Sequence, residues 1–547
     1  MSRTEGRLQS VRTRRKRCCG LNSLCCCSFA VTFLQETPRN SRSVQPLSLV
    51  QPAGVLAASV RSAASLDCRN LALFRIAAGC LLIADAGLRS RDFWLFLSPD
   101  GVFPLPVLRD YLGPGCWSLS FLSADLRWQG LVLGLEALAG LMLLIGLFTP
   151  LACLLAWVIW VSLLRRTAPA LNAGDYWLGC LLFWGLFLPL GDRWSVDARR
   201  RPPTANSSVC SPASFAFVMQ VLAVYLIAGW SKLGGTWLEG TAISFALSPH
   251  DHGTPWGVWL AGIRWLIRPL TWGTVAVELV GPLVYLCSES QRVRRGIALV
   301  FIVFHLGIWS TMTVGLFSPV GIAAWLTLLP LGGCFDAPSS LRSTGNNLRW
   351  QSLCNLVVAC GCIIAASATI QATLRPRQQA PTWLTTAVNL LCLDQAWAMF
   401  GDVGPMEQWV TARTVLADGR VVDLLRRGQP YEPVRPDDGF WSLPNHRWHK
   451  LFWELPKPRQ ESLRPAVAAG LVADWNRRHP PAAAVRSLEL VFTRVSHPGR
   501  KHPVEFPTLA PDGVAASDAP ETVLRQWVLA RWPPGDGGNL QRFLENL

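Results

Sequence analysis

Long stretches of apolar residues recur along the first two thirds of the chain, with short polar loops between them. The stretches lie near residues 71–88, 129–148, 150–164, 176–190, 215–231, 270–287, 296–312, 315–331 and 353–372. Each is close to the roughly 20 residues that a helix needs to cross the hydrocarbon core of a bilayer. The pattern therefore predicts about nine membrane-spanning helices.

Two of these stretches, 129–148 and 150–164, are separated by almost no polar sequence. They form either a tight helical hairpin or one re-entrant element. Pro150 lies at the junction. Because proline breaks a helix that would otherwise continue, it favours the hairpin.

The pattern changes near Arg375, where long apolar stretches end and short alternating runs begin. Residues 410–425 alternate around Asp418-Gly419, which predicts a β-hairpin with a tight turn. Residues 463–478 have helical spacing, and residues 487–495 alternate as a strand. These elements predict an α+β domain.

The chain as a whole is thus expected to be an all-α polytopic membrane helical bundle followed by an exported α+β domain. We place the bundle at residues 66–374 and the extracytoplasmic domain at 375–547. Residues 1–65 begin with an arginine-rich run and an apolar stretch that superficially resemble a signal peptide, but no convincing cleavage site follows. We therefore interpret them as a basic cytoplasmic tail.

Composition supports the membrane assignment. Half of the residues are hydrophobic, only 16% are charged and the mean hydropathy is +0.28. A soluble protein of 547 residues would be less apolar. The net charge of +16 could indicate nucleic-acid binding, but the arginines lie in the tail and in short loops between apolar stretches, where they set membrane topology. We therefore expect the lipid bilayer as the partner and no nucleic acid.

The arginines also predict the topology, because cytoplasmic loops of membrane proteins are enriched in Lys and Arg. With a cytoplasmic tail and nine crossings, Arg199 to Arg201 and Arg292 to Arg295 lie inside. Lys232 and the loop 232–269 then lie outside, as does the terminal domain. We expect a multi-pass protein of the cell inner (cytoplasmic) membrane.

Cysteine and histidine patterns suggest neither a metal nor a haem. The 17 cysteines end at Cys392, so the terminal domain needs no disulfides. His250-Asp251-His252 lacks a distant fourth ligand and is a weak metal signal. His305 is the one histidine in a predicted span, whereas a bis-histidine haem needs two.

Several separated pieces of the sequence resemble the HTTM family, the membrane domain shared with vitamin K-dependent γ-carboxylase. Their order and spacing carry the resemblance more than any single piece does. The pieces are residues 224–240, His305-Leu306-Gly307, 315–319, 73–76 with Asp85 and Arg89, 100–104, 278–282 and 393–400.

The resemblance implies a reaction and a base. In the carboxylase, a lysine deprotonates reduced vitamin K, and Lys232 matches that lysine. Ser231 replaces the lysine that precedes it in the family. Gly174 occupies the position of a family histidine, which weakens the transfer of the mechanism, and Asp175 beside it is expected to cap a helix.

Each matched residue also has a structural interpretation. A catalytic Lys232 must be neutral, so its pKa must be lowered by desolvation, whereas a structural lysine would reach from a helix end to the interface. His305 is either a polar group of the reaction pocket or a neutral imidazole bonded to a neighbouring helix.

The remaining charges in the spans, Arg75, Asp85 and Glu278, must pair or face a cavity, because an unpaired charge there costs roughly 3 kcal/mol. An Arg–carboxylate clamp is the leading interpretation. A polar cavity between helices would also hold a quinone head group, so we assign Arg75, Glu278 and Trp237 to a cofactor site for reduced vitamin K or menaquinol.

Two functions follow from the sequence. The first is a γ-glutamyl-carboxylase-like lyase that uses a quinol on secreted polypeptides, with Lys232 as base and His305 in the pocket. The second is a non-enzymatic membrane scaffold or maturation factor that binds partners through the exported domain. A transporter is disfavoured because inverted repeats are not evident. Aromatic residues around 445–450 suggest core packing ahead of a glycan or peptide groove.

Overall fold

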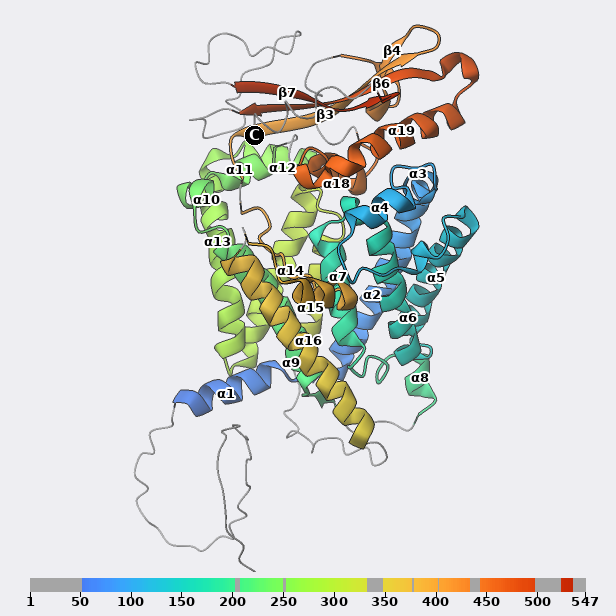
Figure 1. Ribbon diagram of the computed structural model, residues 1–547. Coiled ribbons are helices and arrows are strands. Elements are labelled where there is room, and N and C mark those ends of the chain that lie inside the picture. Colours follow the sequence, from blue (N-terminus) through green and yellow to red (C-terminus); the bar gives the residue numbers. More distant parts are fainter. Residues whose placement is uncertain are drawn as a thin grey trace, which may run out of the picture. The chain divides into compact units, whose positions relative to one another are not determined.

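The computed structural model describes residues 52–201, 207–248, 252–331, 348–375, 378–401, 403–432, 443–496 and 523–534. Residues 52–547 form one compact unit (Figure 1). The unit begins with helix α1 (Pro52–Ala63). Most of the expected basic tail, including its arginine-rich run, lies outside the described residues.

Within the described residues, seven helices are long and apolar enough to cross a bilayer. They are α2 (Cys68–Arg91), α5 (Leu126–Ile145), α6 (Thr149–Arg166), α9 (Pro212–Trp230), α13 (Arg264–Cys287), α14 (Gln291–Thr311) and α16 (Leu348–Leu374).

The other two apolar stretches are also helical but shorter than expected. Helix α7 (Ala173–Gly185) has 13 residues and α15 (Phe317–Leu328) has 12. At 1.5 Å per residue they are roughly 18–20 Å long, against about 30 Å of hydrocarbon. Apolar composition alone could not separate a span from a short helix that is buried by its neighbours.

The junction between α5 and α6 is a hairpin, as Pro150 indicated. Helix α5 ends on Gly146, whose φ of 69° is the left-handed conformation that favours glycine. Pro150 lies in the first turn of α6, where a missing N–H costs nothing. The Asp197 carboxylate accepts from the N–H groups of Phe148 and Thr149 and so caps the new helix.

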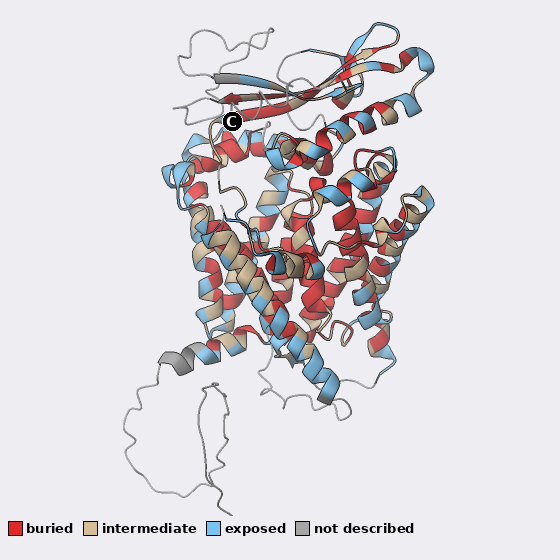
Figure 2. Cartoon of the chain, viewed as in Figure 1, coloured by how far each residue is buried: buried red, intermediate tan, exposed pale blue. Residues whose placement is uncertain are grey.

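The short helices lie at the centre of the bundle. The largest core cluster includes the fully buried rings of Trp160, Trp177, Trp184 and Trp325. Figure 2 shows these inner helices as buried, while the outer faces of the long helices are exposed. An exposed apolar face on a long helix is what lipid contact requires.

The β-rich region forms one antiparallel sheet in the order β5–β4–β3–β6–β7. Its strands are β3 (Met406–Leu416), β4 (Val421–Asp423), β5 (Gln429–Pro430), β6 (Val485–Ser496) and β7 (Val523–Trp532). The predicted hairpin is confirmed, with Val415 opposite Val421 and Gly419 at a φ of 88°. The predicted strand near 487–495 is confirmed as part of β6.

Two helices accompany the sheet, α18 (His446–Glu454) and α19 (Arg464–Arg478), whereas α17 (Thr382–Leu391) packs against α16 in the bundle. Helix α19 confirms the helical spacing of 463–478. In Figure 1, α18 and α19 lie between the sheet and the bundle. The boundary that we placed at residue 375 remains a prediction.

Shorter elements complete the fold. They are the short strands β1 (Leu66–Asp67) and β2 (Ser208–Val209), the helices α3 (Phe93–Leu97), α4 (Leu105–Tyr111), α8 (Val196–Arg199), α10 (Gly235–Glu239), α11 (Ala242–Ala246) and α12 (Pro255–Ala261), and the 3-10 turns η1 (Leu119–Phe121), η2 (Ala168–Ala170), η3 (Leu424–Arg426), η5 (Pro458–Leu463) and η6 (Pro481–Ala483).

The sheet region and the bundle share a second hydrophobic core. Bundle residues from α3 to α4, such as Phe96 and Phe103, belong to the same buried cluster as Leu451 of α18, Val467 of α19 and Leu490 of β6. The core of the terminal region is therefore completed by a segment that lies roughly 350–390 residues earlier in the chain.

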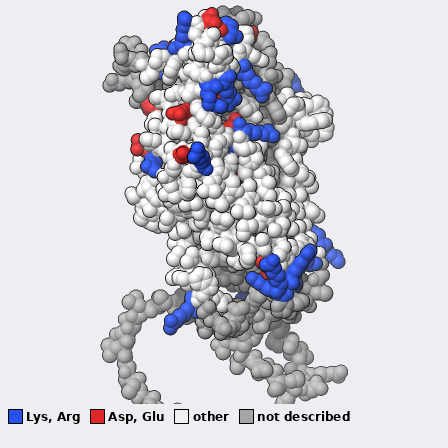
Figure 3. All heavy atoms as spheres, turned by 90° about the vertical axis from the view of Figure 1, so that its right-hand side faces the viewer, with Lys and Arg blue, Asp and Glu red and all other residues white. Residues whose placement is uncertain are grey.

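Charged residues on the face shown in Figure 3 gather at the two ends of the molecule and leave an uncharged band between them. In Figure 1, α8 lies at one end of the bundle, while the sheet lies at the other end together with α10, α11 and α12. An uncharged band between charged ends suits a protein that crosses a bilayer.

Candidate functional site

Lys232 lies just beyond the end of α9 and is buried, with 2% of its surface exposed. Its Nζ is 2.9 Å from Glu278 Oε2 and donates to the carbonyl oxygens of Ala228 (3.2 Å) and Met399 (2.9 Å). The alternative of a lysine that reaches out to the interface is therefore wrong. Two of the three N–H donors of the ammonium thus have carbonyl acceptors, and its charge is paired with the Glu278 carboxylate.

Trp237 and Glu278 join the same cluster. The Lys232 Nζ lies 5.2 Å from the centre of the Trp237 ring, and Trp237 Nε1 donates to the Phe400 carbonyl at 2.7 Å. Lys232 and Trp237 therefore hold two consecutive carbonyls, those of Met399 and Phe400. Three of the five residues assigned from sequence thus lie together, and they fix a segment that follows α17.

His305 belongs to a different cluster, deep in the bundle. It is fully buried on α14, and its Nε2 lies 2.6 Å from the hydroxyl of Tyr225, which also accepts from Trp325 Nε1 at 2.8 Å. The aromatic rings of Trp177 and Phe317 pack against it. Among the described residues, no hydrogen bond or ion pair joins His305 to Lys232.

Among the described residues Arg75 makes no carboxylate clamp, contrary to the expectation. Its guanidinium donates to the carbonyls of Leu143 (2.6 Å) and Leu144 (3.3 Å) at the end of α5, and to that of Trp194 (2.6 Å). A helix end leaves carbonyls without intrahelical partners, and a cation there is favourable. The charge is thus satisfied by backbone dipoles.

Asp85 does form the expected clamp. Arg89, one turn along α2, donates to it from Nε at 2.5 Å. A second arginine, Arg447 of α18, donates from Nη2 at 2.5 Å and lies 3.4 Å from Asp175. The sequence indicated the first arginine, whereas the second comes from the sheet region.

Gly174 is required by close packing at the start of α7. A Cβ at this position would lie 2.4 Å from the backbone nitrogen of Phe317. No side chain fits there, so this bundle has no room for the family histidine. Asp175 is a helix cap as expected, because its Oδ2 accepts from the Asn172 N–H at 2.7 Å.

A cavity of about 900 Å³ lies where α7, α16 and α17 of the bundle meet α18 and η5. Its volume is in the range of small-molecule sites. Apolar side chains line the bundle side, namely Phe245, Val314, Phe317, Ala368, Ala372, Leu384 and Val388. We call this cavity the chamber.

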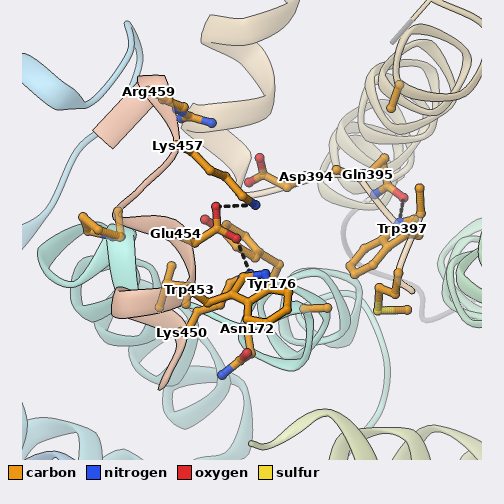
Figure 4. A pocket seen from close by; sticks show the side chains of 18 of the residues that line it. Asn172, Tyr176, Asp394, Gln395, Trp397, Lys450, Trp453, Glu454, Lys457 and Arg459 are labelled. Carbon is orange, nitrogen blue, oxygen red and sulfur yellow. Dashed lines mark hydrogen bonds and ion pairs between the residues drawn. The ribbon is translucent and has the colours of Figure 1, made fainter. Parts of the chain in front are cut away.

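Charged side chains from α18 and η5 line the opposite side of the chamber (Figure 4). Glu454 lies between two lysines, 2.6 Å from Lys450 Nζ and 2.8 Å from Lys457 Nζ. Burial raises the pKa of Glu454, but the two ammonium groups outweigh it and the net pKa is lowered. Arg165 and Asp394 form a longer pair at 3.7 Å.

The segment 394–401 forms a wall of the chamber. It is held by Lys232 and Trp237 and by a buried amide network, in which Trp397 Nε1 donates to Gln395 Oε1 at 2.7 Å and Gln395 Nε2 donates to Gln220 Oε1 at 2.9 Å. Lys232 therefore contributes to the shape of the chamber by binding the segment that forms its wall.

The model of the HTTM domain family matches residues 64–331. These residues are an HTTM domain. With seven helices of spanning length among the described residues, the chain is a multi-pass membrane protein. No solved structure matches it.

The HTTM domain supplies only part of the chamber. Asn172, Tyr176 and Phe317 lie within residues 64–331, but Asp394 and every charged residue of α18 and η5 lie outside this range. The site is therefore a composite of the HTTM domain and the sequence that follows it.

Some chamber residues carried a weak signal in the sequence. Asp394 stands in the 393–400 piece that resembles family members, and Lys450 ends the aromatic run 445–450. His252, from the weak metal motif, packs its ring 5.1 Å from that of Phe400 and lines the chamber. His250 and Asp251 lie outside the described residues. Nothing local indicated that these segments meet.

Proposed function

We propose that this HTTM protein binds a reduced long-chain quinone in the chamber and uses it in γ-carboxylase-like chemistry on secreted polypeptides. The chamber carries the proposal, because its bundle side is apolar and its opposite side is charged. A ligand with an apolar isoprenoid tail and a polar head would place its tail against the apolar side of the chamber and its head against the charged side.

The polar groups of the chamber fit a quinol or quinone head. Asn172 Nδ2 is buried at the chamber and has no hydrogen-bond partner among the described residues. An unpaired buried donor costs roughly 1–3 kcal/mol, so a ligand oxygen that accepted from it would recover that energy. Tyr176 also lines the chamber. When bound, a reduced quinone supplies the electrons and the base strength that the resemblance implies.

The protein's own residues hold and shield this ligand. Asn172 and Tyr176 orient the head, and the wall 394–401, anchored by the buried Gln395 and Trp397, keeps water from the bundle side. Lys232, which is paired with Glu278, keeps the wall in place. For Lys232 to act as the base, its proton must pass to Glu278, 2.9 Å away.

The proposal is tested by measuring menaquinol binding to the full-length protein in liposomes. The readout is quenching of tryptophan fluorescence, because Trp397 and Trp453 line the chamber. We expect saturable binding, weakened roughly 5- to 100-fold by Asn172→Leu, the loss of one buried hydrogen bond. Asn355→Leu is the matched control, because Asn355 is exposed on α16. Wild-type protein that binds no menaquinol would refute the function.

The second candidate, a non-enzymatic binding protein, is favoured by one observation: the buried Lys232 ammonium is already paired with Glu278 and donates to two backbone carbonyls. It predicts menaquinol binding without menaquinol-dependent oxygen consumption or CO2 incorporation. Measuring turnover on the same preparation separates the two functions.

We also propose that the sheet end is exported across the cell inner membrane, because α8 and the neighbouring Arg199 to Arg201 lie at the opposite end of the bundle. Lys- and Arg-rich loops remain in the cytoplasm. Reporter fusions after Arg201 and after Pro381 should report opposite sides of the membrane. Fusions that report the same side would contradict this orientation.

A further inference from the structure

Helix α18 has two distinct faces. Trp448, Leu451 and Phe452 belong to the shared hydrophobic core. Arg447, Lys450 and Glu454 are spaced at i, i+3 and i+7, which places them in one row along the helix. The first residue of this row pairs with the bundle, and the other two line the chamber.

The beginning of α18 is fixed to the bundle at several points. The N-cap residue Asn445 donates from Nδ2 to Asp92 at 2.5 Å, and Trp448 packs edge-on against Phe96 with ring centres 5.9 Å apart. Between these contacts, Arg447 reaches Asp85 and Asp175 with a side chain that is 4% exposed. The positive end of the helix thus faces carboxylates, a favourable arrangement.

The charges at this point depend on Arg447. Arg89 is already bound to Asp85 and to the Thr167 hydroxyl. Among the described ion pairs, Asp175 has Arg447 as its partner. Glu136 of α5 also lies beside Asp85. Without Arg447, one cation would face three buried carboxyl groups, and breaking a buried pair from one side leaves a buried charge without compensation.

We propose that Arg447 is a positioning residue of the chamber: its pairing with Asp85 and Asp175 fixes the register of α18 and so places Lys450, Trp453 and Glu454 over the ligand. Arg447 does not itself line the chamber. The part that concerns the ligand rests on the proposed quinone binding. The part that concerns α18 rests on the contacts alone.

The test compares Arg447→Met with Arg294→Met in the full-length protein. Arg294 is a matched control, because it is equally buried but donates to Tyr285, Ser62 and Ser59 away from the chamber. We expect Arg447→Met to weaken menaquinol binding at least 10-fold and Arg294→Met to change it less than 2-fold, although both lower Tm. Arg447→Lys, which keeps the charge, should restore part of the affinity.

A second measurement needs no ligand. Hydrogen exchange of the α18 amides, residues 446–454, should speed up at least 10-fold in Arg447→Met and stay unchanged in Arg294→Met. If Arg447→Met does not fold, Asp175→Asn, which keeps the shape but removes one charge, should give the same pattern in smaller measure.

Three outcomes would overturn the proposal: unchanged α18 exchange in folded Arg447→Met or Asp175→Asn, an equal loss of affinity in Arg294→Met, or wild-type affinity in Arg447→Met. Wild-type protein that binds no menaquinol refutes the proposed function instead. In that case the exchange measurement still decides whether Arg447 positions α18.

Discussion

Residues 395–547 expressed alone should show no cooperative unfolding transition. Their sequence needs no disulfide, since no cysteine follows Cys392, but their core is incomplete without the bundle. Six large bundle side chains in that core are each at most 4% exposed: Leu95, Phe96, Leu97, Val102, Phe103 and Leu108. Burial of one such side chain contributes roughly 1.5–3 kcal/mol, so six contribute about as much as the roughly 5–15 kcal/mol that holds a typical domain folded.

Circular dichroism and thermal melting of the fragment in reducing buffer measure this directly. Co-expression with residues 52–394 is the control, because it returns the missing core and should give back a folded, co-purifying complex. A sharp thermal transition in the isolated fragment would show that the terminal region is an independent domain.

Lys232→Met should be among the most destabilising single substitutions in the bundle. It leaves the Glu278 carboxylate buried beside the two carbonyls that Lys232 had bound. Removing one partner of a buried pair costs about 3–5 kcal/mol, while replacing both partners with apolar residues is often close to neutral. Lys232→Met combined with Glu278→Leu should therefore recover most of the lost stability.

The same double variant tests the catalytic role of Lys232. If Lys232 only clamps the wall of the chamber, the double variant should keep menaquinol binding and any menaquinol-dependent turnover. If Lys232 is the base, the variant should bind menaquinol but show no turnover. Thermal melting in detergent and oxygen consumption in liposomes provide the two readouts. A Lys232→Met protein with the wild-type Tm would show that the ion pair contributes little.

Local features of the fold could be predicted from the sequence because local chemistry determines them. Apolar length predicted the helices, Pro150 predicted the α5–α6 break, and Asp418-Gly419 predicted the β3–β4 turn. Arg89 lies four residues from Asp85, so helical spacing alone brings them together. The short length of α7 could not be predicted, because a helix buried by neighbouring helices and a helix surrounded by lipid both have apolar sequences.

The chamber could not be predicted from the sequence for a different reason. Its parts come from segments that are hundreds of residues apart, and each part has an ordinary role in its own segment. Lys450 and Glu454 look like a surface i, i+4 pair, and Asn172 looks like a helix cap. The carboxylate clamp expected for Arg75 did not form because helix-end carbonyls, which a pattern of side chains does not show, bind its guanidinium among the described residues.

The distance along the chain between Asp85 and Arg447 has a consequence for biosynthesis. Arg447 follows Asp85 by 362 residues, and at typical translation rates of 5–20 residues per second that interval lasts on the order of 20–70 s. During this time the helices of the bundle are already being inserted, while Asp175 lacks its partner and the apolar side chains of α3 and α4 lack their cover. This end of the bundle therefore stays without its charge partner and its apolar cover until the terminal region has been synthesised.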